Sequence, residues 1–543
     1  MSILPNIFKQ ESEIPPEYRL ERPISVTHYL CDGKLVEFHG ETTKVTSPIC
    51  EQVDGKWVPT FIGTTPNMTD EQVVSCLDAA VRAYSNGAGA WPTMPIEGRI
   101  RHVEAFVEEL IKRRSLLINL LMWEICKNVT DATKEFDRTI DYIRDTINAL
   151  KDLDRGSSRF EIKDDIVAQI RRAPLGVVLC MGPFNYPFNE TMTTLLPAII
   201  MGNTCVFKPP KHGTIMFKPI IECFAKAFPA GVVNSIFGPG GAVITPIITT
   251  GKIDVLAFIG SSGVADKIRV QHPHPHRLRC VLGLDAKNPA IICKDADLDL
   301  AARECVLGAL SFNGERCTAI KIIFVHEAVA NEFVEKVCKE VAKLKVGLPW
   351  DKKEDGTYCN ITPLPERGKV GWMQQMTEDA VSKGAKVVNE HGGDYNETCY
   401  SPAVVFPVTK EMKLFHEEQF GPIVPISVFN DLDVPIEFIR ESKFGQQVAI
   451  FGRDADEIAH LVDPLVNQVC RVNINCQCQR GPDTFPFTGR KDSAEGTLSV
   501  SDALRCFSIR TLVAAKKTPM NTAILQEIVH DRKSAFLSTD FIF

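Results

Sequence analysis

The chain has 543 residues, which is too long for a single hydrophobic core and sufficient for two or three domains. Its residues are 44% hydrophobic and 24% charged, as in globular proteins, and its net charge of −7 does not favour binding to nucleic acid or to an anionic membrane. The 18 cysteines, without a recognisable secretion signal, indicate a reducing compartment. No apolar run is long enough to cross a bilayer, so we expect a cytoplasmic protein.

The first part of the chain combines an extension with helices. Residues 1–40 are rich in proline and charge, and we expect an N-terminal extension rather than a domain. Apolar residues at helix spacing predict helices over 70–84 and 101–121. The alternating pattern of 160–170 follows a charged segment at 151–160 and predicts a projecting hairpin arm.

Strands and helices alternate from residue 176 onward. The expected elements are strands at 176–181, 204–208, 233–237 and 255–259, with helices at 191–200 and 214–228. The pattern returns after residue 290, with strands at 289–293 and 320–325 and a helix at 327–345. This alternation predicts an α/β fold with two doubly wound parallel-sheet domains.

Ligands of such sheets bind beyond the carboxyl ends of the strands. The first strand end carries Asn185, whose amide would either donate to a developing oxyanion or merely close a turn. The next carries Lys208 and Lys211, and two lysines there favour the added 2′-phosphate of NADP. Glycine clusters at 238–241 and 260–263 would let the backbone approach a phosphate, although ordinary turns use the same residues.

Cys317 lies in the segment Asn313-Gly-Glu-Arg-Cys-Thr-Ala319. The preceding Arg316 is expected to lower the pKa of the thiol and so to favour the nucleophilic thiolate. The alternative is that Cys317 is a small buried hydrophobic residue, as a free cysteine usually is. Motifs elsewhere in the chain favour the nucleophile.

Several motifs together resemble those of the aldehyde dehydrogenase superfamily, in its order and at its spacing. They are Pro183-Phe-Asn-Tyr-Pro187, Phe207-Lys-Pro-Pro210, Gly260-Ser-Ser262, Gly314-Glu-Arg-Cys317 and Glu417-Glu-Gln-Phe-Gly-Pro422. The strings Arg-Cys-Thr-Ala, Asn-Tyr-Pro and Gln479-Arg-Gly-Pro-Asp-Thr-Phe-Pro-Phe487 narrow the resemblance to the non-phosphorylating, NADP-dependent glyceraldehyde-3-phosphate dehydrogenases. The resemblance covers about residues 45–515.

The resemblance implies roles for individual residues. Cys317 would attack the aldehyde, and Asn185 with the backbone N–H of Cys317 would hold the oxyanion. Hydride would pass to NADP, and water would then release the acid from a thioester. Lys208 would hold the adenosine ribose and Glu418 the nicotinamide ribose. Further expected cofactor contacts are Lys211, Gly240, Gly260, Ser261 and Phe420.

The resemblance also implies a small phosphorylated aldehyde as substrate. In this branch a tyrosine and several arginines meet the substrate phosphate, and the matching positions here are Tyr186, Arg138, Arg316 and Arg480. Arginine suits a phosphate because its planar donors match the oxygens. A single arginine would more often form a surface ion pair, so the prediction depends on the whole set.

One departure from the family pattern concerns the general base. The family has a glutamate in the string Leu-Glu-Leu-Gly-Gly-Lys, and here the string reads Leu282-Gly-Leu-Asp-Ala-Lys287, which leaves Gly283 at the base position. Glycine cannot accept a proton, and general base catalysis is typically worth about 10²–10⁴-fold. Asp285 is a candidate substitute base. The alternative is that Asp285 crowds the nicotinamide or repels the NADP phosphates. Glu315 is a second candidate base.

Three functions therefore remain open. The first is NADP-dependent oxidation of glyceraldehyde 3-phosphate to 3-phosphoglycerate. This activity would be impaired if no other residue replaces the general base that is missing at Gly283. The second is oxidation of another aldehyde such as a semialdehyde, which would be favoured if Arg138 and Arg480 faced solvent. The third is a catalytically weak or inactive protein with a structural or scaffold role.

The predicted organisation follows the same resemblance. The expected parts are an N-terminal extension at 1–40, a cofactor-binding domain at 41–153 and 173–283, an oligomerisation arm at 154–172 and 496–515, a catalytic domain at 284–495 and a C-terminal extension at 516–543. A homodimer or homotetramer is expected through the arm, and the extensions would contact any protein partner. We expect no metal, because His272-Pro-His-Pro-His276 is more simply a proline-rich loop.

Overall fold

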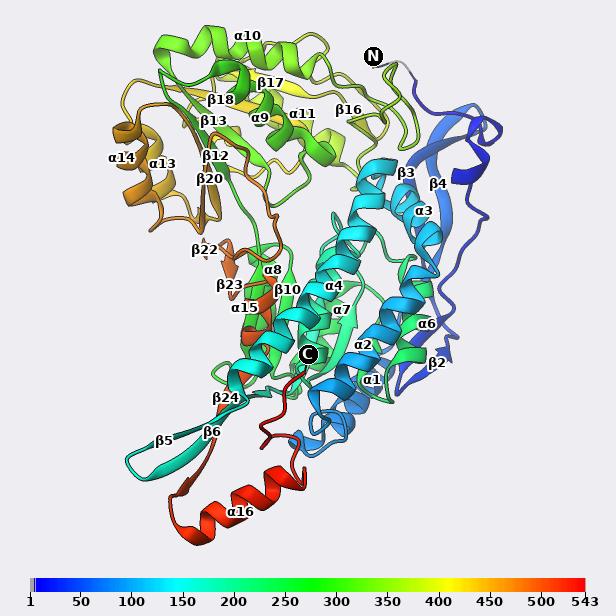
Figure 1. Ribbon diagram of the computed structural model, residues 1–543. Coiled ribbons are helices and arrows are strands. Elements are labelled where there is room, and N and C mark those ends of the chain that lie inside the picture. The colour runs from blue at the N-terminus through cyan, green and yellow to red at the C-terminus, as the bar shows by residue number, and fades with distance from the viewer. Residues whose placement is uncertain (1–3, 5, 543) are drawn as a thin grey trace.

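A computed structural model describes residues 4 and 6–542 (Figure 1). Residues 1–3 and 5 of the predicted N-terminal extension, and residue 543 of the C-terminal one, lie outside the described residues. The chain forms two α/β domains, each with its own mainly parallel sheet, and a β-arm that projects from the first domain. The predicted fold class is therefore confirmed.

The N-terminal segment forms two hairpins on one side of the first domain. Its elements are η1 (Glu11–Glu13), η2 (Pro16–Tyr18), β1 (His28–Cys31), β2 (Lys34–Glu37), β3 (Thr42–Val53) and β4 (Lys56–Pro66). Phe8, Leu20 and Leu30 are buried in the core of the first domain, and the backbone N–H of Leu30 donates to Ser235 Oγ at 2.8 Å. The segment is thus held to this domain by apolar burial.

The first domain is built on a six-stranded sheet in the order β23-β11-β10-β7-β8-β9. Its strands are β7 (Val177–Met181), β8 (Thr204–Lys208), β9 (Val233–Ser235), β10 (Val255–Ile259), β11 (Arg279–Gly283) and β23 (Ala494–Glu495). All neighbours are parallel except β23, which pairs antiparallel with β11. Parallel strands place their carboxyl ends at one edge of the sheet. The last residues of β7, β8 and β11, which are Met181, Lys208 and Gly283, therefore lie at the same edge.

The helices of this domain are α1 (Asp70–Tyr84), α2 (Ile96–Ile111), α3 (Arg114–Ile125), α4 (Val129–Ser157), α5 (Asn189–Ile200), α6 (Phe217–Ala227), α7 (Gly240–Ile248) and α8 (Ser262–Gln271), with the short turn η3 (Ser85–Gly87) after α1. The helix predicted at 70–84 is confirmed. The single helix predicted at 101–121 is wrong, because the chain breaks at 112–113 between α2 and α3. No helix in residues 4 and 6–542 is both long and apolar enough to span a membrane.

The second domain has a seven-stranded sheet in the order β14-β17-β18-β13-β12-β20-β21. Its strands are β12 (Asn288–Ile292), β13 (Ile320–His326), β14 (Lys386–Val387), β17 (Ala403–Phe406), β18 (Ile423–Phe429), β20 (Gln447–Phe451) and β21 (Arg471–Ile474). Two small pairs are β15 (Tyr395–Asn396) with β16 (Cys399–Tyr400), and β19 (Phe444–Gly445) with β22 (Arg490–Lys491).

The helices of the second domain are α9 (Leu298–Leu310), η4 (Ser311–Gly314), η5 (Glu327–Val329), α10 (Ala330–Val341), α11 (Lys369–Ser382), α12 (Lys413–His416), α13 (Asp433–Glu441) and α14 (Ala455–Leu465). The helix predicted at 327–345 is shorter than expected, since the turn η5 precedes it and it ends at Val341. Its buried face consists of Phe333, Val334, Val337 and Val341, which pack on the sheet.

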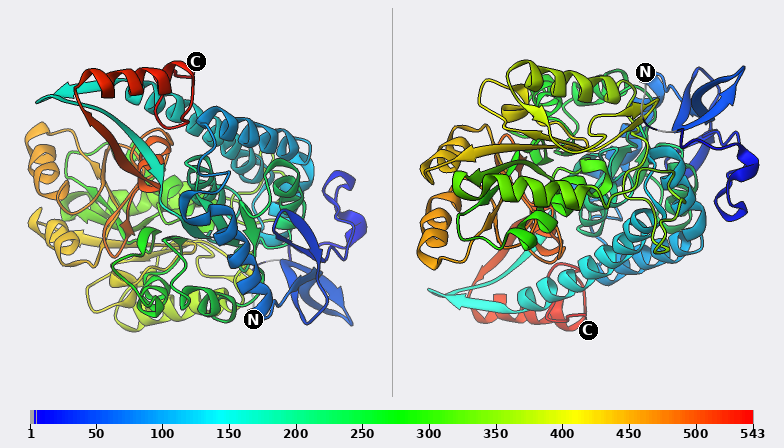
Figure 2. Two further views of the ribbon diagram at one scale, coloured as in Figure 1. Left: turned by 90° about the horizontal axis from the view of Figure 1, so that it is seen from below. Right: turned by 90° about the horizontal axis from the view of Figure 1, so that it is seen from above.

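The arm is a three-stranded antiparallel sheet, β24-β6-β5, formed by β5 (Phe160–Lys163), β6 (Ile166–Pro174) and β24 (Ser508–Lys516). The predicted hairpin is confirmed, and residues 151–157 of the charged segment before it belong to α4. The helix α15 (Val500–Cys506) leads into β24, and α16 (Pro519–His530) runs beside the arm (Figure 2). Ile162 and Leu512 on the arm and Met520 on α16 are exposed. Oligomerisation through this arm stays a prediction.

The carboxyl-terminal segment after α16 is tied to the base of the arm. Arg171 on β6 forms a buried ion pair with Asp154 on α4 and donates to the carbonyl oxygen of Phe536 at 3.0 Å. Gln169 exchanges hydrogen bonds with the backbone of Ser538, at 2.6 Å as donor and 3.2 Å as acceptor. Polar groups of one strand therefore fix both α4 and the chain terminus.

We predict that Arg171→Leu lowers the stability of the protein by about 3 kcal/mol, because it leaves a buried carboxylate unpaired. It should also free the terminal segment for tryptic cleavage at Lys533. The measurements are the urea unfolding midpoint and the rate of cleavage. The control is Arg144→Leu, whose pair with Asp141 is exposed and worth at most about 1 kcal/mol. Equal midpoints for the two variants would contradict this account.

Candidate active site

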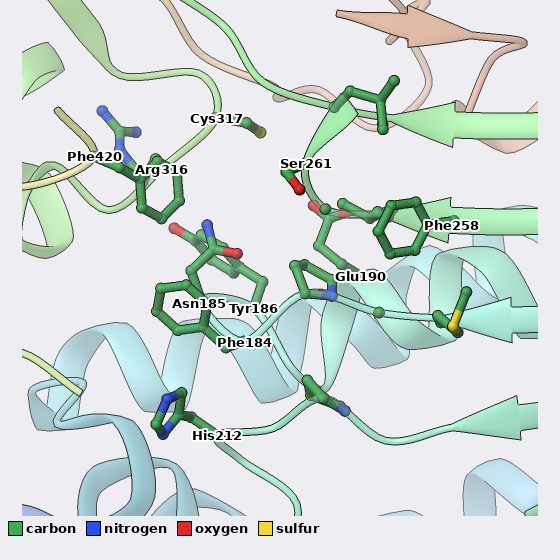
Figure 3. A pocket seen from close by; sticks show the side chains of 18 of the residues that line it. Phe184, Asn185, Tyr186, Glu190, His212, Phe258, Ser261, Arg316, Cys317 and Phe420 are labelled. Carbon is green, nitrogen blue, oxygen red and sulfur yellow. The ribbon is translucent and has the colours of Figure 1, made fainter. Parts of the chain in front are cut away.

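A cavity of about 1120 Å³ lies between the carboxyl ends of the first sheet and the loops that precede β12, β13 and β18 of the second sheet. All of the predicted site residues line it: Arg138, Asn185, Tyr186, Lys208, Lys211, Gly240, Gly260, Ser261, Asp285, Arg316, Cys317, Glu418, Phe420 and Arg480. Figure 3 shows how Asn185, Tyr186, Ser261 and Cys317 face one another across it. The structure thus brings the predicted set together, while the individual roles stay predictions.

The loop that carries Cys317 connects α9 to β13 through an unusual backbone path. Phe312, Asn313 and Gly314 all have positive φ, of 46°, 56° and 71°. A side chain at Gly314 would lie 2.6 Å from the carbonyl oxygen of Ala309 and 2.8 Å from that of Gly421. Only glycine permits this close approach, so Gly314 determines how the loop presents Cys317.

Two buried donors hold the Cys317 backbone. Lys321 Nζ and Asn288 Nδ2 donate to the carbonyl oxygen of Cys317 at 2.9 Å and 2.8 Å. Lys321 also pairs with Glu418, at 2.8 Å. The position of the nucleophile is therefore linked to the residue that we expect to bind the nicotinamide ribose.

The electrostatics of the Cys317 thiol differ from the sequence expectation. Burial raises its pKa, the Glu190 carboxylate raises it further, and Lys321 and Arg480 oppose the rise only in part. The Arg316 guanidinium donates instead to the carbonyl oxygen of Gly308, at 2.7 Å. The prediction of a lowered thiol pKa is therefore wrong, because burial outweighs the nearby cations. The resting thiol must give up a proton before it can attack.

Asn185 is positioned beside the nucleophile loop. Its Nδ2 donates to the carbonyl oxygen of Glu315 at 2.7 Å, and the second hydrogen of the same amide remains for another acceptor. Within residues 4 and 6–542, the backbone N–H of Cys317 has no protein acceptor. This pair of donors suits an oxyanion, which favours that interpretation of Asn185 over a turn-closing role.

The arginines at the other end of the cavity are paired with acids. Arg480 forms a buried ion pair with Glu190 on α5 and lies 3.2 Å from Asp483. Arg138 binds both oxygens of Asp483, at 2.7 Å and 2.6 Å. Their side chains are only 5% and 26% exposed, so neither faces solvent freely.

Two further groups add donors to this end of the cavity. Arg316 Nε is buried and has no hydrogen-bond partner within the described residues. Tyr186 lies under the buried Lys127, whose Nζ is 3.3 Å from the ring centroid, and burial raises the pKa of the Tyr186 hydroxyl. A neutral hydroxyl and a free guanidinium N–H can both donate to an anionic substrate.

The groove on the first-domain side fits a dinucleotide. Burial lowers the pKa of Lys208 to about 8, and its Nζ donates to the carbonyl oxygen of Pro209 at 2.9 Å, which leaves two donor directions for a ligand hydroxyl. Gly240 and Gly241 begin α7, and a Cβ on either would meet no atom within 4 Å. An open helix N-terminus of this kind suits a phosphate.

The N-terminus of α8, unlike that of α7, is not open to a phosphate. Asp285 Oδ2 accepts hydrogen bonds from both the backbone N–H and the hydroxyl of Ser262, each at 2.8 Å. A carboxylate therefore already occupies the place where the helix would meet a phosphate. This position favours the predicted effect of Asp285 on the cofactor phosphates over a role as substitute base.

Some residues of the cavity were not predicted from the sequence. Glu190 is the most important of them, since it influences the Cys317 thiol. Lys321, which holds the Cys317 loop from outside the cavity wall, was not predicted either. The sequence signal for Glu190 was an acidic residue at the start of an apolar helix. We predicted that helix to begin one residue after Glu190, so the signal was missed. Lys321 lies in an apolar strand, where a lone lysine indicates a buried partner.

Only one metal-like cluster occurs within residues 4 and 6–542: Cys293, Asp295 and Glu457, whose ligand atoms lie close together. Glu457 pairs with Lys294 at 2.9 Å, and Asp295 accepts backbone N–H groups from Arg453 and Asp454. These contacts explain the cluster without an ion, and it does not line the cavity.

Comparison with known proteins agrees with this geometry. The sequence profile of the aldehyde dehydrogenase family matches residues 42–513, and the chain belongs to that family. It is 33% identical over 468 residues to the NADP-dependent glyceraldehyde-3-phosphate dehydrogenase of Streptococcus equinus, covering 85% of this chain and 94% of the relative. The malonate-semialdehyde dehydrogenase 2 of Shouchella clausii is 27% identical over 88% of this chain and 99% of its own length.

A solved structure gives the same result for the fold. The NADP-dependent glyceraldehyde-3-phosphate dehydrogenase of Bacillus halodurans C-125, complexed with NADP, superimposes with a TM-score of 0.81 at 31% identity. The match covers 91% of this chain and 99% of the other. The predicted superfamily is therefore confirmed.

We predict that Asp285→Asn tightens NADPH binding about tenfold, or ~1.4 kcal/mol. The amide keeps an oxygen for the Ser262 donors and removes a negative charge that would face the cofactor phosphates. The measurement is a fluorescence titration with NADPH, and the gain should shrink at high salt. Asp266→Asn, an exposed position on the same helix, is the control. Unchanged affinity in Asp285→Asn would show that the carboxylate does not oppose the cofactor.

Proposed function

We propose that this protein is an NADP-dependent aldehyde dehydrogenase that oxidises glyceraldehyde 3-phosphate to 3-phosphoglycerate through a thioester on Cys317, and that release of this thioester limits turnover. The observation that carries the proposal is that Arg138, Arg316 and Arg480 line the same cavity as Cys317. The names of the similar proteins support the same substrate and cofactor.

The recognition of a phosphate would begin at Arg316. Its Nε is buried and has no hydrogen-bond partner in residues 4 and 6–542, and Tyr186 and Lys134 line the same cavity. Arg138 and Arg480 add positive charge, although Asp483 and Glu190 balance part of it. A phosphate dianion would thus meet one free arginine and two shared ones, so we expect moderate rather than tight substrate binding.

The first half of the reaction follows from the groups around Cys317. The thiol loses its proton to solvent water and its sulfur attacks the aldehyde carbon, while Asn185 Nδ2 and the backbone N–H of Cys317 donate to the resulting oxyanion. When bound, NADP would accept the hydride from that carbon. Lys208 and Glu418 line the groove at positions suited to the two riboses of the cofactor.

The second half of the reaction is where this chain departs from its family. A water must attack the thioester, and Gly283 at the end of β11 offers no proton acceptor. A Cβ added at Gly283 would lie 3.5 Å from Ile259 and 3.6 Å from Leu498, which are ordinary contacts. The backbone therefore tolerates a side chain there, and its absence affects proton transfer rather than folding.

A semialdehyde is the second candidate substrate. The observation that favours it is the pairing of Arg480 with both Glu190 and Asp483, which reduces the positive charge available to a phosphate dianion. A carboxylate carries less charge than a phosphate and needs only one free arginine, such as Arg316. The 27% identical relative that is named for malonate semialdehyde supports this alternative.

We predict that mixing the protein with NADP and glyceraldehyde 3-phosphate gives a rapid burst of NADPH, close to one per Cys317, and then a slow steady phase. The measurement is stopped-flow NADPH absorbance, repeated with malonate semialdehyde and with unphosphorylated glyceraldehyde. Gly283→Glu should accelerate the steady phase about 10²-fold or more, because it places a proton acceptor at the position that the family uses for its general base.

The control for this experiment is Cys317→Ser, which should abolish the burst. A larger burst rate with malonate semialdehyde than with the phosphorylated aldehyde would favour a semialdehyde as the substrate. No burst with any of the three aldehydes would overturn the proposal and favour a scaffold role.

A further inference from the structure

A small cavity lies beside the main one, where β11 ends at Gly283. Its volume of about 20 Å³ is enough for about one water molecule. Gly283, Cys317 and Glu190 all line it. A Cβ at position 283 would meet Ile259 and Leu498, which also line this cavity, at ordinary contact distances, so a side chain there would lie at the cavity wall.

Glu190 enters this region from the first turn of α5. Figure 3 shows its side chain projecting into the pocket that Cys317 also faces. Arg480 Nη1 binds one carboxylate oxygen, Oε1, and the other, Oε2, is 3.4 Å from the Thr193 hydroxyl. The ion pair thus fixes the carboxylate in place and leaves lone pairs on Oε2 for another donor.

We propose that Glu190 is the general base that replaces the missing side chain at 283, acting on a water molecule held between its carboxylate and Cys317. This inference rests on the proposed thioester chemistry and deepens it. The water oxygen attacks the thioester carbonyl carbon while one water proton passes to Glu190. The C–S bond then breaks, the carboxylic acid leaves, and the proton returns from Glu190 to the Cys317 thiolate.

The other acids near Cys317 are less suited to this role. Asp285 is engaged by two donors of Ser262 at the start of α8. Glu315 does not line either cavity, and burial raises its pKa to about 8, so it is mostly protonated at neutral pH. Glu418 is paired with Lys321 and is absent from the wall of the small cavity.

The electrostatic effect on the thiol supports the proximity of Glu190. Among the charged groups that shift the Cys317 pKa, Glu190 has the largest effect, and it opposes ionisation. Such an effect requires a short separation in a poorly solvated site. The same negative charge that disfavours the resting thiolate is available to accept a proton once the sulfur has been acylated.

The test uses p-nitrophenyl acetate, which acylates a thiol without any cofactor. The released nitrophenolate should show a burst on acylation of Cys317 and a steady phase set by hydrolysis of the acetyl thioester. Glu190→Gln keeps an oxygen for Arg480 but cannot accept the proton, so we expect an unchanged burst amplitude and a steady phase at least about 100-fold slower. The double variant Gly283→Glu, Glu190→Gln should recover the steady phase.

A second variant tests the water rather than the carboxylate. In Gly283→Ala the added methyl group fits at ordinary contact distances and displaces the water, while Glu190 remains. We expect a slower steady phase here too. The control is Glu222→Gln, which alters a glutamate that is also paired with an arginine, Arg113 at 3.4 Å, but lies outside both cavities.

A third readout does not require turnover. The rate of alkylation of Cys317 by iodoacetamide rises with pH as the thiol ionises, and removal of the Glu190 charge should shift this profile to lower pH. A steady phase in Glu190→Gln equal to that of the unmodified protein, or an alkylation profile that does not move, would overturn the inference. Because the ester needs neither aldehyde nor NADP, failure of the proposed function would appear separately, as a missing NADPH burst.

Discussion

The buried ion pair between Glu190 and Arg480 is the interaction on which the active site depends. It joins the first turn of α5, in the first domain, to the loop after β21, in the second domain. Breaking a buried pair by removing one partner typically costs about 3–5 kcal/mol, because the other charge is left without compensation. The pair therefore fixes one wall of the cavity against the other, and it places an acid and an arginine beside Cys317.

This single pair links two properties that would otherwise be independent. Arg480 is one of the three arginines that we propose for a substrate phosphate, so the Glu190 carboxylate would reduce the charge that such a substrate meets. The same carboxylate lies near the cavity at Gly283, where proton transfer is required. Under our proposal, a chain with glycine at the base position keeps a proton acceptor but attracts an anionic substrate less strongly.

Much of this architecture was predictable from the sequence. The alternation of apolar strands and amphipathic helices indicated two parallel sheets, and motifs such as those around Asn185, Lys208 and Cys317 indicated which strand ends meet. The order of the motifs also placed Arg138 and Arg480, which are more than 300 residues apart, in one cavity. The two parallel sheets follow from local pattern, and the positions of Asn185 and Lys208 follow from the rule that ligands bind at the carboxyl ends of parallel strands. The positions of Arg138, Cys317 and Arg480 were implied by the resemblance to the aldehyde dehydrogenase superfamily.

The remainder depends on contacts that no local pattern contains. The Cys317 pKa was predicted to be lowered by Arg316, but the direction depends on burial and on Glu190, which lies 127 residues earlier in the chain. The position of Asp285 likewise depends on donors of Ser262, which belongs to a different element. A helix break at 112–113 has no proline or glycine to mark it. In each case the outcome depends on tertiary packing, which local sequence patterns do not contain.

The most direct test of the account is the mass of the intact protein during turnover. The protein is mixed with NADP and glyceraldehyde 3-phosphate, quenched in acid in the steady phase, and analysed by mass spectrometry. If thioester release limits turnover, most of the protein should carry one acyl group, and peptide mapping should place it on Cys317. A protein that remains unmodified while NADPH continues to accumulate would contradict the account, because release would then be faster than acylation.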